Sequence, residues 1–377
     1  MAVAVVALKE RAQGERRVAL TPETARKFRA LGADVLIESG AGFTAGFADQ
    51  AYSDARVCQV EAALAEADVL LCVQAPPDDM LARLKPGTLV VGALAPYSGD
   101  SRIRALRDAR TTAFALELLP RTTRAQAMDI LSSQAGMAGY KAVLIAAEVS
   151  GKFFPMLTTA AGTIRPSKVL IVGAGVAGLQ AIAPARRLGA QVEGFDVRPE
   201  TREQIESLGA RFLDLGVSAA GSGGYARELT AEERAEQQRR LADHLTGVDV
   251  VVTTAAVPGR PAPKIISAAM VAGMKTGSVI VDLAAETGGN CELTQAGETI
   301  HTDNGVTVVG PRHLASMGCI HASEMYARNL YNFLALAIKD GAIGLDWDDE
   351  LIAQTCLTHA GEIRHAPTQQ RVEGGAA

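Results

Sequence analysis

Three glycines follow an apolar run in VLIVGAGVAG (residues 169–178), at the spacing Gly173-x-Gly175-x-x-Gly178. Between a strand and a helix, the first such glycine makes a tight turn, the second lets the backbone approach a pyrophosphate, and the third lets helix and strand pack closely. The phosphates would lie at the start of the following helix, where unpaired N–H groups and the helix dipole attract anions. These residues therefore predict a bound dinucleotide.

An acidic residue ends the next strand pattern, QVEGFD at residues 191–196, about 20 residues beyond the glycines. A carboxylate at that place accepts a hydrogen bond from a ribose 2′-hydroxyl and repels a 2′-phosphate. Asp196 therefore favours NAD(H) over NADP(H) as the nucleotide on this chain. The alternative for the same residues is an ordinary strand–helix–strand turn with an aspartate on the surface.

A second group of polar side chains lies in RAQAMDILSSQ, residues 124–134, which holds one arginine, two glutamines, one aspartate and two serines. The segment joins an apolar strand pattern to a long helical pattern. One interpretation is a polar helix start, with Asp129 or Ser132 as N-cap and the other side chains in solvent. The other is a loop whose neutral hydrogen-bonding groups contact a ligand. The residue types alone leave both interpretations open.

Length and composition limit the class of protein. The chain of 377 residues is long enough for about two domains, and 48% hydrophobic with 21% charged residues excludes a disordered chain. The net charge of −5 comes without a basic stripe, so nucleic acid is not an expected partner. We expect neither a signal peptide nor a membrane span. Five scattered cysteines fit a reducing cytoplasm, and Cys319 with His321 lacks a second ligand pair, so no metal is expected.

Alternating strand and helix patterns fill residues 1–120, which predicts a parallel sheet covered by helices. One helix is expected to start with Thr21 as N-cap and Pro22 as its first residue. Two longer helices are expected over residues 135–154 and 322–341. Strand and helix patterns also alternate between these two helices, which predicts a second sheet.

The expected fold is α/β, with two Rossmann-like, doubly wound parallel-sheet domains around a cleft, joined by the two long helices. Residues 1–134 together with 316–377 would form the first domain. Residues 135–315 would form the second, NAD(H)-binding domain. Within the second domain, residues 216–228 are rich in Gly and Ser and are expected to form a flexible loop.

Several segments resemble one known family: RAQAMDILSSQ, GVAGLQAIA, DVRPETREQIESLGA, GGYARE, TTAAVPGRPAP and SVIVDLAAETGGN. In this order they are similar to the NAD(H)-binding domain I of proton-translocating NAD(P)+ transhydrogenases. The resemblance runs from the N-terminal strand to near residue 370, and the length is similar to bacterial forms in which this domain is a separate alpha subunit. ERRVALTPE is also similar to alanine dehydrogenases, which share the fold.

The resemblance implies an enzyme in which a hydride passes between NADH on this chain and NADP+ on a partner subunit, coupled to proton translocation across the membrane. It implies a membrane-embedded partner, an NADP(H)-binding partner, and a homodimer of this chain. The chain would be cytoplasmic and associated peripherally with the inner membrane through those partners. Two other functions stay open: an NAD-dependent amino-acid (alanine-type) dehydrogenase, and a non-catalytic NADH-binding regulatory module.

The resemblance also assigns residues to regions of the nucleotide. At the nicotinamide end it implies the catalytic residues Arg121, Gln126, Asp129 and Ser132, with Ala127 and Met128 beside them. Val176 would belong to the glycine turn. The adenosine side would be bound by Asp196, Val197, Arg198, Gln237 and Ala256, and by Gly224 and Tyr225 of a loop that closes on the nucleotide. For Gln237, an ordinary surface position is the alternative.

The two related chemistries differ in their need for an acid or base. Amino-acid oxidation moves protons as well as a hydride, whereas transfer between two nicotinamides depends on orientation. By alignment with alanine dehydrogenases, Gln74 stands at a lysine position and Gly92 at about a histidine position, and neither can shuttle a proton. Arg17 is either the counterpart of the carboxylate-binding arginine or an ion-pair residue. PRHLASMGCIHAS departs from the family's Pro-Ser-Arg stretch, and His313 and His321 receive no role.

Overall fold

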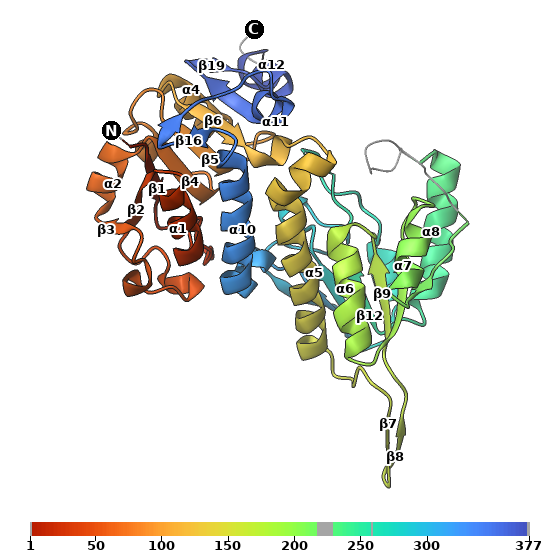
Figure 1. The fold of residues 1–377 in the computed structure, drawn as a ribbon. Helices are drawn as coiled ribbons and strands as arrows, with labels where there is room; N and C mark the ends of the chain where they lie inside the picture. Colours follow the sequence, from red (N-terminus) through yellow and green to blue (C-terminus); the bar gives the residue numbers. More distant parts are fainter. Residues whose placement is uncertain (1, 217–228, 258, 375–377) are drawn as a thin grey trace. The chain divides into compact units, whose positions relative to one another are not determined.

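The computed structural model describes residues 2–216, 229–257 and 259–374. The chain divides into two compact α/β units (Figure 1): residues 1–134 with 316–377 form the first, and residues 135–315 form the second. The chain passes from the first unit to the second within the helix α5 (Ile130–Val149) and returns after Ala315. Each unit contains a largely parallel sheet of its own.

The first unit is built on an eight-stranded sheet with the order β19-β18-β6-β5-β4-β1-β2-β3. Strands β1 to β6 are parallel and follow the doubly wound order 3-2-1-4-5-6. The strand order reverses between β1 and β4, the place where open α/β sheets bind ligands. The strands are β1 (Ala4–Ala7), β2 (Asp34–Glu38), β3 (Arg56–Cys58), β4 (Val69–Gln74), β5 (Leu89–Ala93), β6 (Thr112–Ala115), β18 (Cys356–His359) and β19 (Glu362–Ile363).

Helices cover both faces of this sheet, because alternate strand residues point to opposite sides and both sides are apolar. Val5 and Val6, neighbours in β1, belong to the two different core clusters. The cluster of Val5 includes residues of α1 (Pro22–Ala30) and α10 (Cys319–Leu334). The cluster of Val6 includes residues of α2 (Val60–Glu66), α3 (Asp78–Leu81), α4 (Asp100–Asp108) and α12 (Ala366–Gly374).

The second unit repeats this topology in a seven-stranded sheet with the order β11-β10-β9-β12-β13-β15-β14. Its strand order reverses between β9 and β12, and only β14, at the edge, is antiparallel. The strands are β9 (Lys168–Val172), β10 (Gln191–Phe195), β11 (Arg211–Phe212), β12 (Val250–Thr253), β13 (Val279–Asp282), β14 (Thr299–His301) and β15 (Thr307–Val309). Two doubly wound α/β sheets, as the sequence predicts, are therefore confirmed.

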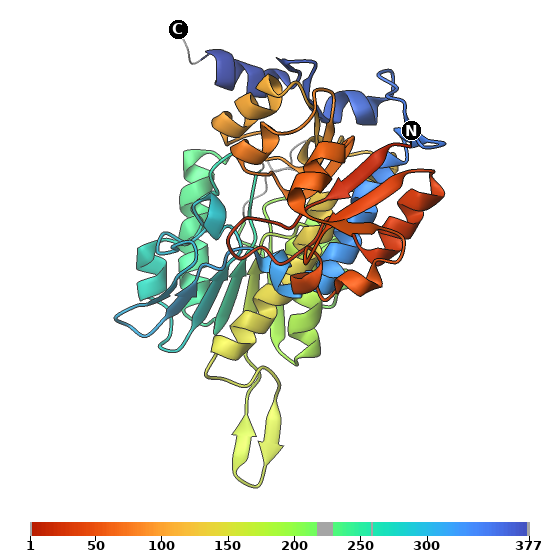
Figure 2. The same ribbon diagram turned by 90° about the vertical axis from the view of Figure 1, so that its left-hand side faces the viewer.

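Two core clusters also enclose the second sheet. One contains residues of α5, α6 (Val176–Arg187) and α7 (Thr201–Ser207). The other contains residues of α8 (Ala231–Leu245) and α9 (Ala268–Ala272). Figure 2 shows the strands of this sheet with helices on both sides. In the stretches of the chain that the structure describes, no helix is both long and apolar enough to cross a membrane.

Helix starts follow the predicted signals better than helix ends do. α1 begins as expected, with Pro22 first and the Thr21 hydroxyl accepting a hydrogen bond from the Thr24 N–H. The long helix expected over residues 135–154 is α5 and begins earlier, at Ile130. The cause is the Asp129 carboxylate, which accepts the N–H of Ser132 and so caps the helix at that point.

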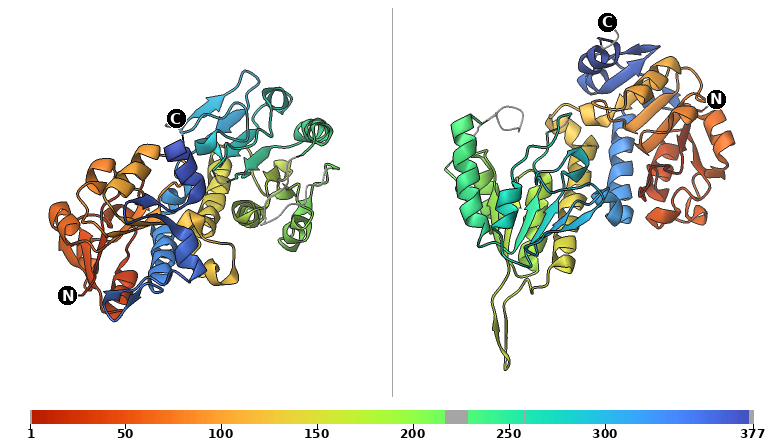
Figure 3. Two further views of the ribbon diagram at one scale, coloured as in Figure 1. Left: turned by 90° about the horizontal axis from the view of Figure 1, so that it is seen from above. Right: turned by 180° about the vertical axis from the view of Figure 1, so that it is seen from behind.

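The other long helix, expected over residues 322–341, is α10 and ends at Leu334. The chain then forms a short hairpin of β16 (Ile338–Lys339) and β17 (Ala342–Ile343), with Asp340 and Gly341 at positive φ of 50° and 71°. Those backbone angles are incompatible with a continued helix. A second hairpin, β7 (Leu157–Thr159) with β8 (Gly162–Ile164), was not expected and projects from the second unit (Figures 1 and 3).

Candidate functional site

The glycine turn lies between β9 and α6, and its three glycines meet different surroundings. Gly173 has a φ of +98°, and a Cβ there would lie 2.7 Å from the Thr254 hydroxyl oxygen. A Cβ at Gly178 would overlap the Gly173 carbonyl oxygen, so α6 can approach β9 only with glycine at this position. A Cβ at Gly175 would meet nothing within 4 Å. The first and third glycines therefore serve the fold, and the second leaves the backbone open.

The start of α6 has the features of an anion site. Gly175 is its N-cap residue and supplies no side-chain cap. Val176 is the first helical residue and is 47% exposed. The N–H groups of the first turn of a twelve-residue helix therefore lack side-chain partners from the cap, and the helix dipole adds positive potential there. This arrangement suits a phosphate or pyrophosphate.

Asp196, directly after β10, is tied to the glycine turn. One carboxylate oxygen accepts the Ala174 N–H at 2.7 Å, so the acid lies beside the turn, as the sequence predicts. The same carboxylate is paired with Arg198, whose N–H and Nε lie 2.9 Å from one oxygen and whose Nη2 lies 2.7 Å from the other. Asp196 is 8% exposed, and Val197 is partly buried against the core. The turn, the acid and its cation thus form one cluster.

The segment after β12 completes the edge of the sheet where the strand order reverses. The Thr254 hydroxyl donates to the carbonyls of Val172 and Gly173, at 3.3 and 3.1 Å. Ala256 follows and is exposed. The structure therefore brings Ala256 to the same edge as the glycine turn. Sequence reasoning missed Thr254, although its place just beyond the end of a predicted strand was a usable signal.

Two other predicted contacts differ in outcome. Gln237 is buried on α8, on the same helical face as Leu241 and Leu245, so the alternative of an ordinary surface position is wrong. Gly224 and Tyr225, and all but the first residue of the predicted loop 216–228, lie outside the described residues.

The polar junction in the first unit is a 3-10 helix, η4 (Thr123–Met128), followed by α5. Asp129 is the N-cap: its two carboxylate oxygens accept the N–H of Ser132 at 2.9 Å and the hydroxyl of Ser132 at 2.5 Å. Ser132 is thus inside the helix and is not the cap. Gln126 is exposed, and its side chain forms no hydrogen bond with the described residues. Arg121 and Ala127 are also exposed, whereas Met128 packs into the core.

Contacts with α10 hold this junction in place. The Ala127 carbonyl accepts hydrogen bonds from the side-chain amides of Asn329 and Asn332, both at 2.9 Å. The Ser133 hydroxyl donates to the Asn329 side-chain oxygen at 2.7 Å. A capped helix start is therefore confirmed, and it fixes the backbone on both sides of the exposed Gln126. The capped start and the ligand-contacting loop are compatible interpretations.

The first unit has the same strand order, but its own carboxylates accept the N–H groups at the strand ends. Glu38, the last residue of β2, accepts the Lys9 N–H at 2.8 Å, just after β1. Glu117 accepts the N–H groups of Leu94 and Ala95 after β5, at 3.1 and 2.7 Å. Burial raises the pKa of Glu117. This edge is therefore filled by side chains from within the unit.

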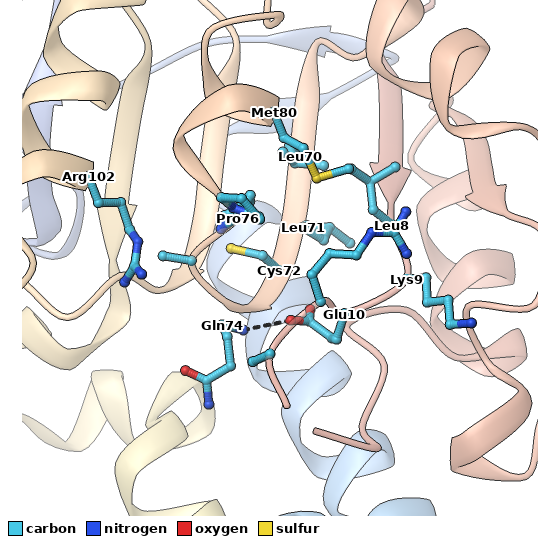
Figure 4. A pocket seen from close by; sticks show the side chains of 14 residues that line it. Leu8, Lys9, Glu10, Leu70, Leu71, Cys72, Gln74, Pro76, Met80 and Arg102 are labelled. Carbon is cyan, nitrogen blue, oxygen red and sulfur yellow. Dashed lines mark hydrogen bonds between the residues drawn. The ribbon is translucent and has the colours of Figure 1, made fainter. Parts of the chain in front are cut away.

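Glu10 blocks the point at which the strand order of the first unit reverses. Its carboxylate accepts the N–H groups of Val73 and Gln74 at the end of β4, at 2.6 and 3.1 Å. Burial raises its pKa to about 7. A cavity of about 230 Å³ lies beside it (Figure 4), and Cys72 and Met80 are among its lining residues. The Gln74 side chain points away from Cys72 and Met80 in this view.

Arg17 is an ion-pair residue, one of the two interpretations of its sequence position. Its Nε and Nη2 lie 2.8 and 2.6 Å from the two carboxylate oxygens of Glu15, and its Nη1 donates to the Gln134 side chain at 2.8 Å. Burial opposes ionisation of Glu15, but the hydrogen bonds and charge of Arg17 lower the Glu15 pKa to about 2. The Gln74 side chain also donates to Glu15, at 3.2 Å.

Gly92 lies too close to β4 to be replaced by a residue with a side chain. A Cβ at this position would overlap the Cys72 carbonyl oxygen and lie 2.8 Å from the Cys72 sulfur. Gln74 carries no titratable proton and is held by Glu15. The lysine and histidine positions of an alanine dehydrogenase therefore hold no group that can shuttle a proton.

Comparison with known families covers nearly the whole chain. The family model described as "Alanine dehydrogenase/PNT, N-terminal domain" matches residues 6–138, and the corresponding C-terminal domain model matches residues 142–366. An NAD(P) transhydrogenase alpha subunit of Rhodospirillum rubrum is 43% identical over 371 residues, which cover 95% of this chain and 96% of that protein.

Two solved structures have a similar fold. A transhydrogenase from Sinorhizobium meliloti has a TM-score of 0.87 and 43% identity, covering 96% of this chain and 99% of that chain. An L-alanine dehydrogenase has a TM-score of 0.81 and 27% identity, covering 100% of both chains. The sequence is thus nearer to this transhydrogenase than to this alanine dehydrogenase.

Proposed function

This chain belongs to the family of NAD(P) transhydrogenase alpha subunits, and we propose that it is the NAD(H)-binding subunit of a proton-translocating transhydrogenase. A hydride passes between NADH on this chain and NADP+ on a partner subunit, and the transfer is coupled to proton translocation across the membrane. The observation that carries the proposal is the turn after β9, where the backbone at Gly175 is open and Asp196 is bonded to Ala174.

The proposed contacts follow the order of a dinucleotide along the edge of the second sheet. The N–H groups at the start of α6 bind the pyrophosphate, next to Gly173, Gly175, Val176 and Gly178. Asp196, Val197 and Arg198 surround the adenosine ribose, because they follow directly after β10. Gln237 and Ala256 lie on the adenine side. The nicotinamide end is contacted by Arg121, Gln126, Ala127, Met128, Asp129 and Ser132.

When bound, the nicotinamides supply the hydride chemistry, and this chain supplies orientation. Reacting carbons must be held about 3–3.5 Å apart for such a transfer. Gln126 can contribute because its side chain is exposed while its backbone is fixed by Asp129 and by the contacts of α10 with Ala127. No acid or base is needed from this chain, which agrees with Gln74 and Gly92 at the positions discussed above.

The partners are proposed to be a membrane-embedded subunit and an NADP(H)-binding subunit, through which this chain is held at the cytoplasmic side of the inner membrane. A homodimer is also proposed. It is supported by the β7–β8 hairpin, all of whose strand residues are exposed. The hairpin and its approach expose Phe153 at 54%, Met156 at 66% and Ile164 at 42%. An isolated two-stranded hairpin is marginally stable in water, so a second copy of this chain is the proposed cover.

The test of the proposed function compares Gln126→Asn with Asp129→Ala in a complex reconstituted with the partner subunits. Gln126→Asn should lower hydride transfer by about 10²-fold, since a misplacement of about 1 Å costs that much. Its NADH affinity, from NADH fluorescence, and its melting temperature should stay near wild type. Asp129→Ala should lower the free energy of unfolding by about 1 kcal/mol through the lost helix cap.

Three outcomes separate the candidate functions. Wild-type transfer by the Gln126 variant would contradict its role in alignment. Absence of any transfer in the reconstituted wild-type complex would favour a non-catalytic NADH-binding module. Turnover of alanine by the chain alone would favour an amino-acid dehydrogenase. The coding sequences beside that of this chain offer a separate check on the partners, because genes for a membrane subunit and an NADP(H)-binding subunit are expected there.

A further inference from the structure

Asn290 is a fully buried polar residue that sequence reasoning did not single out. It has 0% exposure and follows the turn of Gly288 and Gly289, which adopt positive φ of 104° and 79°. Its side chain points into the second unit and makes no use of solvent. A buried amide is retained in a core only when its hydrogen-bonding groups are satisfied, so its partners indicate its role.

The Asn290 side chain is bonded to backbone groups of two separate segments. Its oxygen accepts the Ala255 N–H at 3.0 Å, and its Nδ2 donates to the Ala255 carbonyl at 2.7 Å. The same nitrogen donates to the Pro263 carbonyl at 2.9 Å. Ala255 thus has both of its backbone groups held by one side chain. These partners require one acceptor and two N–H donors at once, which among short side chains only the asparagine amide provides.

The position of Asn290 is itself fixed from the neighbouring strand. Asp282, the last residue of β13, is fully buried. One of its carboxylate oxygens accepts the N–H of Cys291 at 3.0 Å and the hydroxyl of Thr294 at 2.7 Å. The residue after Asn290 is therefore anchored to the end of the sheet, and Asn290 can hold Ala255 in a defined place.

Ala255 adjoins the glycine turn. Thr254, the preceding residue, donates its hydroxyl to the Gly173 carbonyl at 3.1 Å. A Cβ at Gly173 would lie 3.2 Å from the Ala255 nitrogen, so the two backbones are in close contact. A chain of contacts thus runs from the end of β13, through Asn290 and Ala255, to the glycine turn after β9.

We propose that Asn290 is a positioning residue for the nucleotide site: it holds the segment after β12 against the glycine turn, so that the turn keeps the shape that binds a pyrophosphate. The proposal rests on the proposed binding of NAD(H) and adds to it a residue that does not touch the nucleotide. It assigns to Asn290 an effect on the dinucleotide as a whole and little effect on adenosine contacts, which lie at Asp196 on the other side of the turn.

The test uses Asn290→Asp, which keeps the volume but sets carboxylate oxygens against two carbonyls. At pH 8 the variant should bind NADH about ten-fold more weakly than wild type by fluorescence titration. AMP, measured by competition against NADH, should bind with nearly unchanged affinity, because it lacks the pyrophosphate. At pH 5.5 the buried carboxyl takes up a proton and regains a donor, so the ratio of variant to wild-type dissociation constants should fall toward one.

Ser278→Ala is the matched control. Ser278 is also 0% exposed, and its hydroxyl donates to the Val248 carbonyl at 3.1 Å, but it precedes β13 and so lies at the opposite end of the strands. This variant should lower the melting temperature without changing NADH binding. Asn290→Ser, which keeps a single hydroxyl, provides a second variant should the aspartate prevent folding, and it should also weaken NADH binding about ten-fold.

The proposal is overturned if folded Asn290 variants bind NADH like wild type, or if Ser278→Ala weakens NADH binding equally at a similar loss of melting temperature. It is also overturned if AMP and NADH lose affinity in parallel, since that would indicate general damage to the unit. A wild-type chain that does not bind NADH would instead refute the proposed function, so the two failures are distinguishable.

Discussion

Asp196→Asn should convert the preference of this chain for NADH into tolerance of NADPH, and the reason lies in the ion pair with Arg198. Four N–H groups surround the Asp196 carboxylate, three of them from Arg198, so carboxylate and guanidinium nearly cancel in charge. Asparagine keeps an oxygen for the Ala174 N–H but removes the negative charge. The guanidinium then faces the ribose 2′ position as a net cation.

The size of the change follows from simple electrostatics. A 2′-phosphate carries about −1.5 to −2 charges near neutral pH. Two unit charges 4 Å apart interact by about 4 kcal/mol at an effective dielectric constant of 20. After solvent screening, one charge-assisted hydrogen bond stabilises by about 1.5–3 kcal/mol. NADPH should therefore bind roughly 10- to 100-fold more tightly to Asp196→Asn than to wild type, whereas NADH, which loses the charged acceptor, should bind about five-fold more weakly.

Fluorescence titration of both nucleotides against four proteins gives a double-mutant cycle: wild type, Asp196→Asn, Arg198→Ala and the double variant. The double variant should lose the gain in NADPH affinity, because the cation is gone. Melting temperatures control for loss of the buried pair. The reasoning is refuted if the double variant binds NADPH as tightly as Asp196→Asn, or if wild type already binds both nucleotides equally.

Three further outcomes are expected. Gly92→Ala should lower the melting temperature strongly by forcing β5 away from the Cys72 carbonyl, and a normal melting curve would contradict the close approach. Burial holds the pKa of Glu10 at about 7 against an ordinary 4.5, so the folded chain keeps a proton that the unfolded chain has lost. Stability should fall as pH rises between those values, by about 2–3 kcal/mol at most, and Glu10→Gln should flatten this slope in urea unfolding at pH 5 and pH 8. Replacing residues 157–164 by a short Gly-Ser turn should give monomers in sedimentation, and an unchanged sedimentation coefficient would remove the hairpin from the dimer.

Local features of the sequence predicted the local structure well. The glycine spacing, Asp196 and the Thr21–Pro22 helix start depend on neighbouring residues, and each has the expected geometry. The two parallel sheets followed from alternation of strand and helix patterns. Helix ends were less accurate, because Asp129 and the β16–β17 hairpin determine them through contacts that leave only weak composition signals.

The features of the site that sequence reasoning missed depend on contacts between distant segments. Asn290 is 35 residues from Ala255, and Thr254 is 81 residues from Gly173. No periodic pattern or motif spacing marks such pairs, since each residue has an ordinary local environment in its own turn. β18, which pairs antiparallel with β6 from the far end of the chain, was missed for the same reason.

The two units also show how a single position can separate two sheets of the same strand order. After β9, the second residue of the turn donates its N–H to an acid at the end of the neighbouring strand: Ala174 to Asp196 at 2.7 Å. After β1, the second residue does the same: Lys9 to Glu38 at 2.8 Å. Counted from the strand ends, the third residue is Gly175 in one unit and Glu10 in the other.

This third position has opposite surroundings in the two units. At Gly175 a Cβ would meet open space at the start of α6. At Glu10 a partly buried carboxylate reaches across to the Val73 and Gln74 N–H groups, and its pKa near 7 reflects the burial of that charge. A pyrophosphate at Glu10 would compete with a carboxylate for the same N–H donors and would face its negative charge. Strand order therefore supplies an edge that can bind a nucleotide, and the residue at this one position favours the edge of the second unit.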